Sequence, residues 1–181
     1  MTATLRDGTP VALRTLRPQD RDRLGQEYLA LPAADQYSRF LAPAASLTPR
    51  MLHRLVDHVD GITHVALLLM LASGEEIAIG RFARPDTEAD EAEVAFAVKQ
   101  DWQGLGAGAA LCDGLVVAAQ RLGIASFTGT LHTGNTASYR LMLRAGDLVR
   151  RESVYAGTLE VTVALRTPAQ PAPPLLSDDQ P

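Results

Sequence analysis

The chain has 181 residues, of which 46% are hydrophobic, and a formal net charge of -4 at pH 7. The longest apolar run, Val65 to Ala72, has eight residues, whereas a membrane-spanning helix needs about 20. This slightly negative net charge excludes the basic surface of a typical nucleic-acid-binding protein. Cys112 is the single cysteine, which excludes an internal disulfide. The N-terminus lacks the apolar core of a signal peptide. The chain length, the single cysteine and this N-terminus together predict one globular, cytoplasmic domain.

The first third of the chain predicts a hairpin followed by helices. Asp7-Gly8 is a turn signal between two short strands within Leu5 to Leu16. Start and stop residues then predict three helices, over Pro18–Leu31, Ala33–Phe40 and Thr48–Gly61.

The rest of the chain alternates strands and helices. Strands are expected over 63–71, 76–84, 92–98 and 126–131, helices over 109–122 and 136–145, and two last strands within 147–164. This order predicts an α/β or α+β sheet with helices on both faces, formed by residues 1–166. Residues 167–181 contain five prolines and no periodicity, which predicts a disordered tail.

The most informative stretch is Gln103 to Ala109, which places three glycines in five residues between a strand and a helix. Backbone N–H groups and the positive end of the helix dipole meet there, so the loop is a candidate anion site, and a diphosphate is its natural ligand.

Two nucleotide motifs fit this loop poorly. Gly104-x-Gly106-x-x-Ala109 matches a dinucleotide-binding pattern, but five residues separate it from its strand and no carboxylate ends the next strand. A phosphate-binding P-loop is excluded because no Lys-Ser/Thr pair follows the last glycine. A nucleotide-binding module stays an alternative that ligand binding can test.

Gln103-x-x-Gly106-x-Gly108 resembles the diphosphate-binding motif of the general N-acetyltransferase (GNAT) superfamily. Asn135-x-x-Ser138-x-x-Leu141-x-x-x-x-Gly146 is similar to the next motif of that family. The resemblance extends from about Thr9 to Arg166. It implies one domain with a mixed, mostly antiparallel sheet that binds acetyl-CoA. The implied cofactor-binding residues are Phe96, Ala97, Val98, Gln103, Gly104, Leu105, Gly106, Ala107, Gly108, Ala109 and Asn135.

A narrower set of segments resembles bacterial protein-lysine acetyltransferases. These segments are Arg39-Phe40, Leu55 to Asp60, Ala92 to Phe96 and Trp102 to Gly104. The resemblance implies a lysine amine of a protein as the acceptor. Membership of the wider superfamily would allow a homodimer, because pairing through the last strands is common there. Some members also carry a cyclic-nucleotide-binding domain, and this chain is too short to contain one.

Glu93 is the candidate general base. Family members transfer the acetyl group directly to an amine, and a lysine amine with a pKa near about 10.4 must first lose a proton. Glu93 shares a strand face with the small Ala95 and Ala97, and burial there would raise the pKa of its carboxyl. Glu91 is the alternative base, and a solvated strand residue is the alternative interpretation of Glu93. The backbone N–H of Val98 is the implied donor to the acetyl carbonyl.

Several other residues have simpler interpretations. Met142 stands where the family often has a tyrosine acid, so no general acid is assigned. Asn135 fits a helix N-cap as well as a cofactor contact. Cys112 and His132 are expected to be structural rather than catalytic, and the histidines show no ligand spacing for a metal.

The leading hypothesis is therefore an acetyl-CoA-dependent N-acetyltransferase that acts on a protein lysine. A small-molecule amine is the second candidate acceptor. A catalytically silent acyl-CoA-binding regulator is a third hypothesis, supported only by Met142. Neither nucleic acid nor a membrane is expected as a partner.

Overall fold

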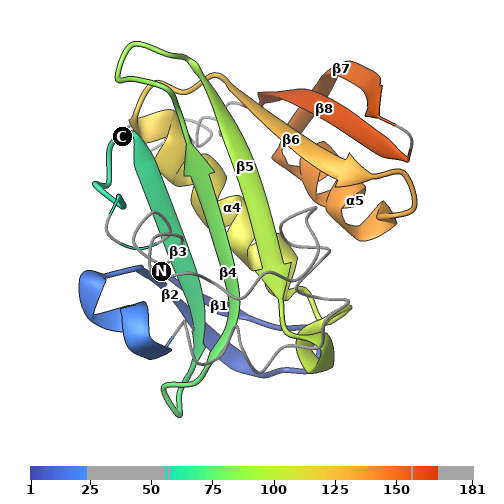
Figure 1. The fold of residues 1–181 in the computed structure, drawn as a ribbon. Coiled ribbons are helices and arrows are strands. Elements are labelled where there is room, and N and C mark those ends of the chain that lie inside the picture. Colours follow the sequence, from blue (N-terminus) through green and yellow to red (C-terminus); the bar gives the residue numbers. More distant parts are fainter. Residues whose placement is uncertain (24–55, 57, 156, 167–181) are drawn as a thin grey trace, which may run out of the picture.

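The computed structural model describes residues 1–23, 56, 58–155 and 157–166. An eight-stranded sheet with the order β1-β2-β3-β4-β5-β6-β8-β7 is its central element (Figure 1). The strands are β1 (Thr2–Thr4), β2 (Pro10–Thr15), β3 (His64–Leu71), β4 (Glu76–Ala83), β5 (Glu91–Val98), β6 (Ser126–His132), β7 (Gly146–Tyr155) and β8 (Thr158–Leu165). β5 and β6 are parallel, and the other neighbouring pairs are antiparallel. The expected mixed, mostly antiparallel sheet is confirmed.

The N-terminal hairpin forms at the predicted turn, but its strands are shifted. Thr4 pairs with Pro10, so Leu5 lies in the turn, where its N–H donates to the Thr9 carbonyl at 2.9 Å. Gly8 has a φ of 89°, which a residue with a side chain rarely adopts. Leu5 is nevertheless buried in the core, so its apolar character reflects packing rather than a strand.

Two helices cover one face of the sheet, here called the helix face. α4 (Ala107–Arg121) packs on β3, β4 and β5, and α5 (Thr136–Ala145) packs on β6, β7 and β8 (Figure 1). The bounds of α5 are those predicted, whereas α4 begins two residues earlier because Gly106 is its N-cap. Both helices share one apolar core, whose largest fully buried side chains include Phe82, Phe127, Leu69, Ile77, Leu111 and Leu115.

Two glycines let α4 approach the sheet closely. A Cβ on Gly114 of α4 would lie 2.6 Å from Leu13 Cδ2, and a Cβ on Gly80 of β4 would lie 2.9 Å from Leu115 Cδ1. Protein interiors are packed too densely to absorb such overlaps without displacement. These glycines are therefore required for packing rather than for their backbone conformation.

The opposite face, here called the second face, carries a smaller apolar cluster. Its buried members are Leu16, Val56, Ala66, Leu68, Met70 and Ile79. The helix expected from Pro18 begins with a 3-10 turn, η1 (Pro18–Asp20), and is helical through Arg23. The remainder of that helix and most of those expected over 33–40 and 48–61 lie outside the described residues, as does the tail expected from Thr167.

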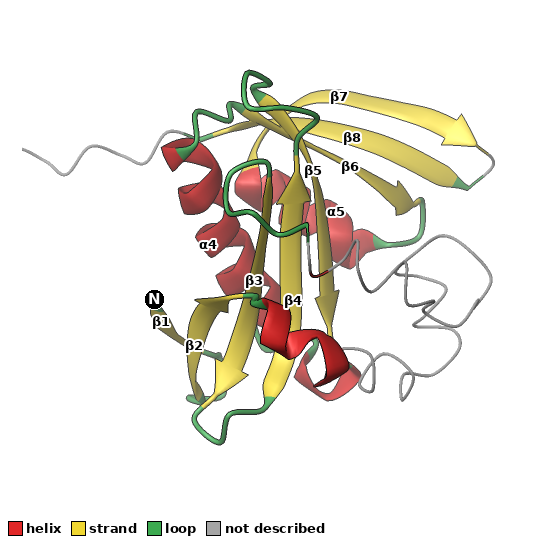
Figure 2. Cartoon of the chain, turned by 60° about the vertical axis from the view of Figure 1, so that its left-hand side comes forward, coloured by secondary structure: helices red, strands yellow, loops and turns green. Residues whose placement is uncertain are grey.

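Gly146 ends α5, as predicted, but not through a left-handed cap. Its φ of -171° is extended, and the chain passes directly from α5 into β7. A Cβ at this position would collide with the Ala164 carbonyl of β8, which explains why glycine stands there. β7, β8 and β6 lie at a large angle to β3 and β4 in Figure 2, so the sheet is strongly twisted.

Candidate functional site

β5 and β6 separate along their length and form a fork. Their parallel pairing covers only Glu91–Glu93 against Ser126–Thr128. Beyond it the strands diverge (Figure 1), leaving Val94–Val98 on one side and Gly129–His132 on the other. A Cβ on Gly129 would lie 3.4 Å from the Val94 carbonyl oxygen, so the two strands are closest where the fork begins.

The fork exposes unused hydrogen-bonding groups of β5. The Lys99 N–H donates to the Ile77 carbonyl at 3.0 Å, on the β4 side of the strand. Since backbone groups alternate sides along a strand, those of Phe96 and Val98 point into the fork. Gln103 Nε2 donates to the Val98 carbonyl at 3.2 Å, which supports this orientation. Among the described residues, no strand partner satisfies the N–H groups of Phe96 and Val98.

The glycine-rich loop follows β5 directly, through the short 3-10 turn η3 (Gln100–Trp102). Gly104 and Gly106 have φ values of 75° and 99°, and both conformations favour glycine. The first hydrogen bond of α4 runs from the Ala110 N–H to the Gly106 carbonyl at 3.0 Å. The N–H groups of residues 107–109 therefore have no intrahelical acceptor and are available to an anion.

The third glycine of the loop has a different role. A Cβ on Gly108 would lie 3.1 Å from Leu141 Cδ1 of α5 and 3.7 Å from Val98 Cγ2 of β5. Gly108 thus lets α5 pack against the start of α4 beside the fork. Trp102 is half-buried and packs against the main core.

Arg6 contacts the glycine loop, a role for which the sequence offers no indication. Its Nη1 donates to the Gly104 carbonyl at 3.2 Å, and its backbone N–H donates to the Leu105 carbonyl at 2.9 Å. The turn of the β1–β2 hairpin is thereby fastened to the glycine loop. The contact joins residues 98 positions apart, and no local pattern in the sequence marks it.

Asn135 is the N-cap of α5, as one of its two interpretations predicted. Its Oδ1 accepts a hydrogen bond from the Ser138 N–H at 3.0 Å. Removing such a cap typically costs about 1 kcal/mol. The cofactor contact implied by the resemblance remains a prediction.

Glu93 projects from the second face and is exposed. The prediction that its carboxylate is buried is therefore wrong. Alternation along β5 directs Val94 into the helix-face core and Glu93 and Ala95 away from it. His64 of β3 lies two strands away on the same face, because it pairs with Ala83, which in turn pairs with Glu93. Burial, reinforced by Arg81, lowers the pKa of His64, which favours a neutral imidazole.

Met142 occupies the fork from the α5 side. It is buried, and its Sδ lies 3.3 Å from the position of a Cβ on Gly129. Its thioether provides no proton donor at this position. Tyr139 does not replace it, because its ring packs under the Arg151 guanidinium at 5.4 Å, on the β7 side of α5.

Cys112 is structural, as predicted. It is fully buried in α4, and burial raises the pKa of its thiol to about 12. Its Sγ lies 3.4 Å from the Leu141 carbonyl of α5, so the side chain fills the interface between the helices. His132 Nδ1 lies 3.3 Å from the Gly157 carbonyl. Over the described ranges, no three His, Cys, Asp or Glu residues are grouped closely enough to hold a metal.

Comparison with known proteins identifies the family. Residues 11–146 match the model of the Acetyltransferase (GNAT) domain. The chain belongs to the GNAT acetyltransferase family. It is 32% identical over 160 residues to Acetyltransferase Pat of Mycolicibacterium smegmatis, covering 88% of this chain and 47% of that protein. It is also 30% identical over 151 residues to an acetyltransferase of Pseudomonas aeruginosa, covering 82% and 81%.

The crystal structure of the GNAT domain of S. lividans PAT has the same fold. It superimposes with a TM-score of 0.82 at 30% identity, covering 91% of this chain and 96% of that one. The expected single GNAT-type domain is thus confirmed. This GNAT chain spans about half the length of the Mycolicibacterium relative. None of its described helices combines the length and apolar character needed to cross a membrane.

Proposed function

We propose that this GNAT protein transfers an acetyl group from acetyl-CoA to an amine. The observation that carries the proposal is the continuity of the β5–β6 fork with the glycine loop. Within the part of the chain that the structure describes, β5 has free N–H groups at Phe96 and Val98, and the free N–H groups at the start of α4 follow within the next residues. The family uses acetyl-CoA, and this arrangement suits a long ligand with an amide-containing arm and a diphosphate.

Each part of the site fits one part of that ligand. The N–H groups of residues 107–109 suit the diphosphate because they combine donors with the positive end of the α4 dipole. Phe96 and Val98 can hold the pantetheine amides as a neighbouring strand would. Gln103 and Asn135, which flank the fork, complete the set of binding residues. When bound, acetyl-CoA supplies an activated acetyl thioester.

Glu93 is the proposed general base. A lysine-type amine is protonated near neutral pH, and a carboxylate on the second face next to small alanines can accept its proton. The Val98 N–H, which points into the fork, can donate to the acetyl carbonyl as negative charge develops on it. No residue needs to protonate the departing thiol, because a thiol pKa near about 8.5 makes the thiolate a good leaving group.

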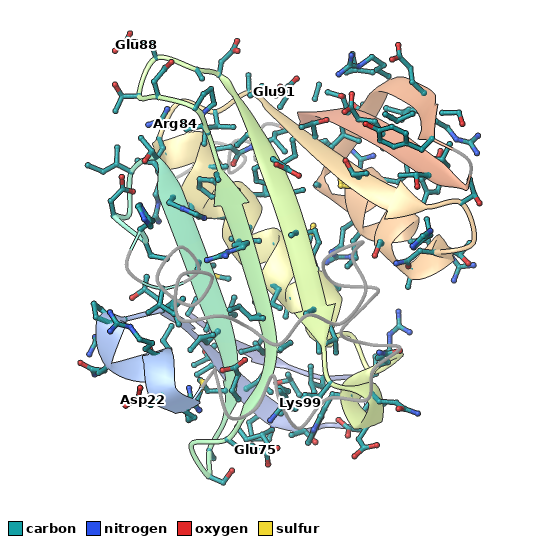
Figure 3. All side chains as sticks on the ribbon, in the orientation of Figure 1. Asp22, Glu75, Arg84, Glu88, Glu91 and Lys99 are labelled. Carbon is teal, nitrogen blue, oxygen red and sulfur yellow. The ribbon has the colours of Figure 1, made fainter. Side chains whose placement is uncertain are left out.

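We further propose a protein lysine as the acceptor. The resemblance to bacterial protein-lysine acetyltransferases supports this choice, as does the acidic end of the sheet near Glu93. Glu88 and Glu91 lie at this end (Figure 3), and the Arg84 Nη1 fixes the loop by donating to the carbonyls of Ala89 and Leu122. Negative charge near the proposed base favours a cationic acceptor. A homodimer through the last strands and a cytoplasmic location remain predictions.

The test compares two glycines of similar backbone conformation, one in the glycine loop and one in the turn between β3 and β4. Gly104 and Gly74 have φ values of 75° and 86°, and a Cβ would meet open space at either. Alanine at each position costs about 1 kcal/mol of backbone strain. Calorimetry should show weaker CoA binding for Gly104→Ala and unchanged binding for Gly74→Ala, with acetyl transfer to lysine-containing peptides reduced in parallel. Equal effects of the two variants would refute the proposed site.

A further inference from the structure

The first turn of α4 lacks the side chains that usually stand at a helix N-terminus. Within the described residues, no side chain caps Gly106, and the first turn contains no acidic residue. α5, in contrast, is capped by the side chain of Asn135. Oxygen acceptors and negative charges are favoured at a helix N-terminus because they complement its free N–H groups and the positive end of its dipole. At the start of α4 this complement is missing from the protein itself.

A positively charged side chain lies there instead. Arg6 belongs to the turn of the β1–β2 hairpin, which reaches the loop that follows β5 (Figure 1). Its Cγ lies 3.8 Å from the position of a Cβ on Gly106, so its aliphatic stem lies against the N-cap of α4. Its Nη1 and its backbone N–H donate to the carbonyls of Gly104 and Leu105. These contacts hold the guanidinium beside the glycine loop.

Most of the hydrogen-bond donors of the Arg6 guanidinium are unused. A guanidinium has N–H groups on all its nitrogens, and in the described part of the chain the Arg6 side chain makes one hydrogen bond, to the Gly104 carbonyl. The carboxylate of Asp7, the next residue, accepts from the Thr9 N–H at 3.0 Å. Arg6 is exposed, so its remaining donors are accessible to a ligand.

Two other basic residues of this region are held by carboxylates. Lys99, which precedes the glycine loop, forms an ion pair with Glu75 at 3.4 Å. Arg144 of α5 forms one with Asp113 of α4 at 2.6 Å. Arg6 forms no ion pair with any described residue, and a positive charge next to the positive end of a helix dipole is unfavourable. An anion bound at this point would neutralise both.

We propose that Arg6 binds a phosphate group of CoA and makes the N-terminal hairpin part of the cofactor site. The inference rests on the proposed function, since it takes the glycine loop as the site of the CoA diphosphate. CoA carries this diphosphate and a separate 3'-phosphate, and the planar N–H groups of a guanidinium match phosphate oxygens well. Because the chain has a net charge of -4, a local cation is needed to attract such an anion.

The test separates the charge of Arg6 from its hydrogen bond to the loop. Arg6→Gln removes the charge and keeps an amide that can donate to the Gly104 carbonyl, whereas Arg6→Lys keeps the charge. Calorimetry at low salt should show CoA binding weakened about threefold in Arg6→Gln, since an exposed ion pair contributes little, and less in Arg6→Lys. The difference should vanish near about 1 M salt, where charges are screened beyond about 3 Å. Arg121→Gln, exposed at the far end of α4, is the matched control and should bind CoA as the parent protein does.

Two shortened ligands identify the phosphate. Dephospho-CoA lacks the 3'-phosphate, and pantetheine lacks every phosphate. Pantetheine should bind equally well to the parent protein and to Arg6→Gln. If Arg6→Gln weakens dephospho-CoA as much as CoA, Arg6 binds the diphosphate; if dephospho-CoA is unaffected, Arg6 binds the 3'-phosphate. An equal loss for pantetheine and CoA would overturn the proposal, as would an unchanged affinity of Arg6→Gln for CoA.

Failure of this inference can be told from failure of the proposed function. If Gly104→Ala weakens CoA binding and Arg6→Gln does not, the proposed site stands and the role of Arg6 is overturned. If the parent protein binds CoA through Arg6 but transfers no acetyl group to any amine, the role of Arg6 stands and the proposed transfer fails. A direct readout is the Nε–H resonance of 15N-labelled Arg6, which should shift when CoA is added and not when pantetheine is added.

Discussion

The two faces of the sheet in this GNAT domain differ in how apolar they are. The helix face is apolar throughout its centre and carries α4 and α5 on a continuous core. The second face has a small apolar cluster, and polar groups such as Arg14, Asp20 and Glu93 lie around it. Stability is therefore expected to depend mostly on the helix face, and the proposed acetyl transfer on the second face and the fork. A site can therefore keep exposed polar groups when the opposite face of the sheet supplies most of the folding free energy.

The largest expected effect is on the rate of the Glu93→Gln variant. Losing a general base should lower kcat by about 100- to 10,000-fold, with little change in melting temperature because Glu93 is exposed. The deficit should shrink as the pH approaches the amine pKa of about 10.4, where the acceptor is deprotonated without help. Steady-state kinetics across pH test this expectation.

Glu91→Gln is the control for that variant. Glu91 lies two residues earlier on the same face of β5 and is also exposed. A large loss of rate in Glu91→Gln together with a fully active Glu93→Gln would transfer the role of base to Glu91.

The helix face should show the opposite behaviour. The rings of Phe82 and Phe127 are 5.6 Å apart in the middle of the core, and both are fully buried. Phe127→Ala should lower the free energy of unfolding by about 3–5 kcal/mol, as measured by urea denaturation. A loss below about 1 kcal/mol would contradict the assignment of the folding free energy to this face.

Acid should weaken the second face before the helix face. Arg14 donates two hydrogen bonds of 2.7 Å to the nearly buried Asp20 carboxylate, and this interaction lowers the pKa of Asp20. A lowered pKa stabilises the fold above the unfolded value of about 3.9, and that stability is lost as the pH falls through the folded value. Asp20→Asn should therefore cost about 1.5–3 kcal/mol at pH 7, and this cost should shrink as the pH falls below the unfolded value of about 3.9.

The control for Asp20 is an exposed ion pair. Asp147 accepts from Arg166 at 3.0 Å, but its side chain is 78% exposed. Asp147→Asn should change stability by less than about 1 kcal/mol at any pH. If both variants lose the same stability, burial of Asp20 is not what makes its ion pair effective.

The smallest expected effect concerns the fastening of the glycine loop. Arg6→Ala removes the exposed hydrogen bond to the Gly104 carbonyl and should weaken CoA binding by roughly two- to fivefold. Arg121→Ala, at the far end of α4, removes an equally exposed charge and should leave binding unchanged. Calorimetry on both variants separates a local contact from the general effect of positive charge.

The features that could be predicted from the sequence are those that depend on residues close together in the chain. The α5 bounds follow from the Asn135 cap and from Gly146, and the loop glycines Gly104 and Gly106 do adopt the left-handed backbone that their residue type favours. Strand bounds differ by a few residues where an apolar side chain such as Leu5 is buried from a turn.

What the sequence could not provide depends on contacts between distant segments. Exposure of Glu93 depends on what covers the second face, and alternation along β5 does not determine this. The contact of Arg6 with Gly104 joins residues 98 positions apart. The short pairing of β5 with β6, which leaves the fork open, depends on the register of these two strands, which local patterns do not determine.

A crystal structure of the protein with bound CoA tests the central claim most directly. We expect the diphosphate at the N–H groups of residues 107–109 and the pantetheine arm along Val94–Val98, within hydrogen-bond distance of the Phe96 and Val98 backbone. CoA bound elsewhere, or a fork closed by continuous pairing of β5 with β6, would contradict it.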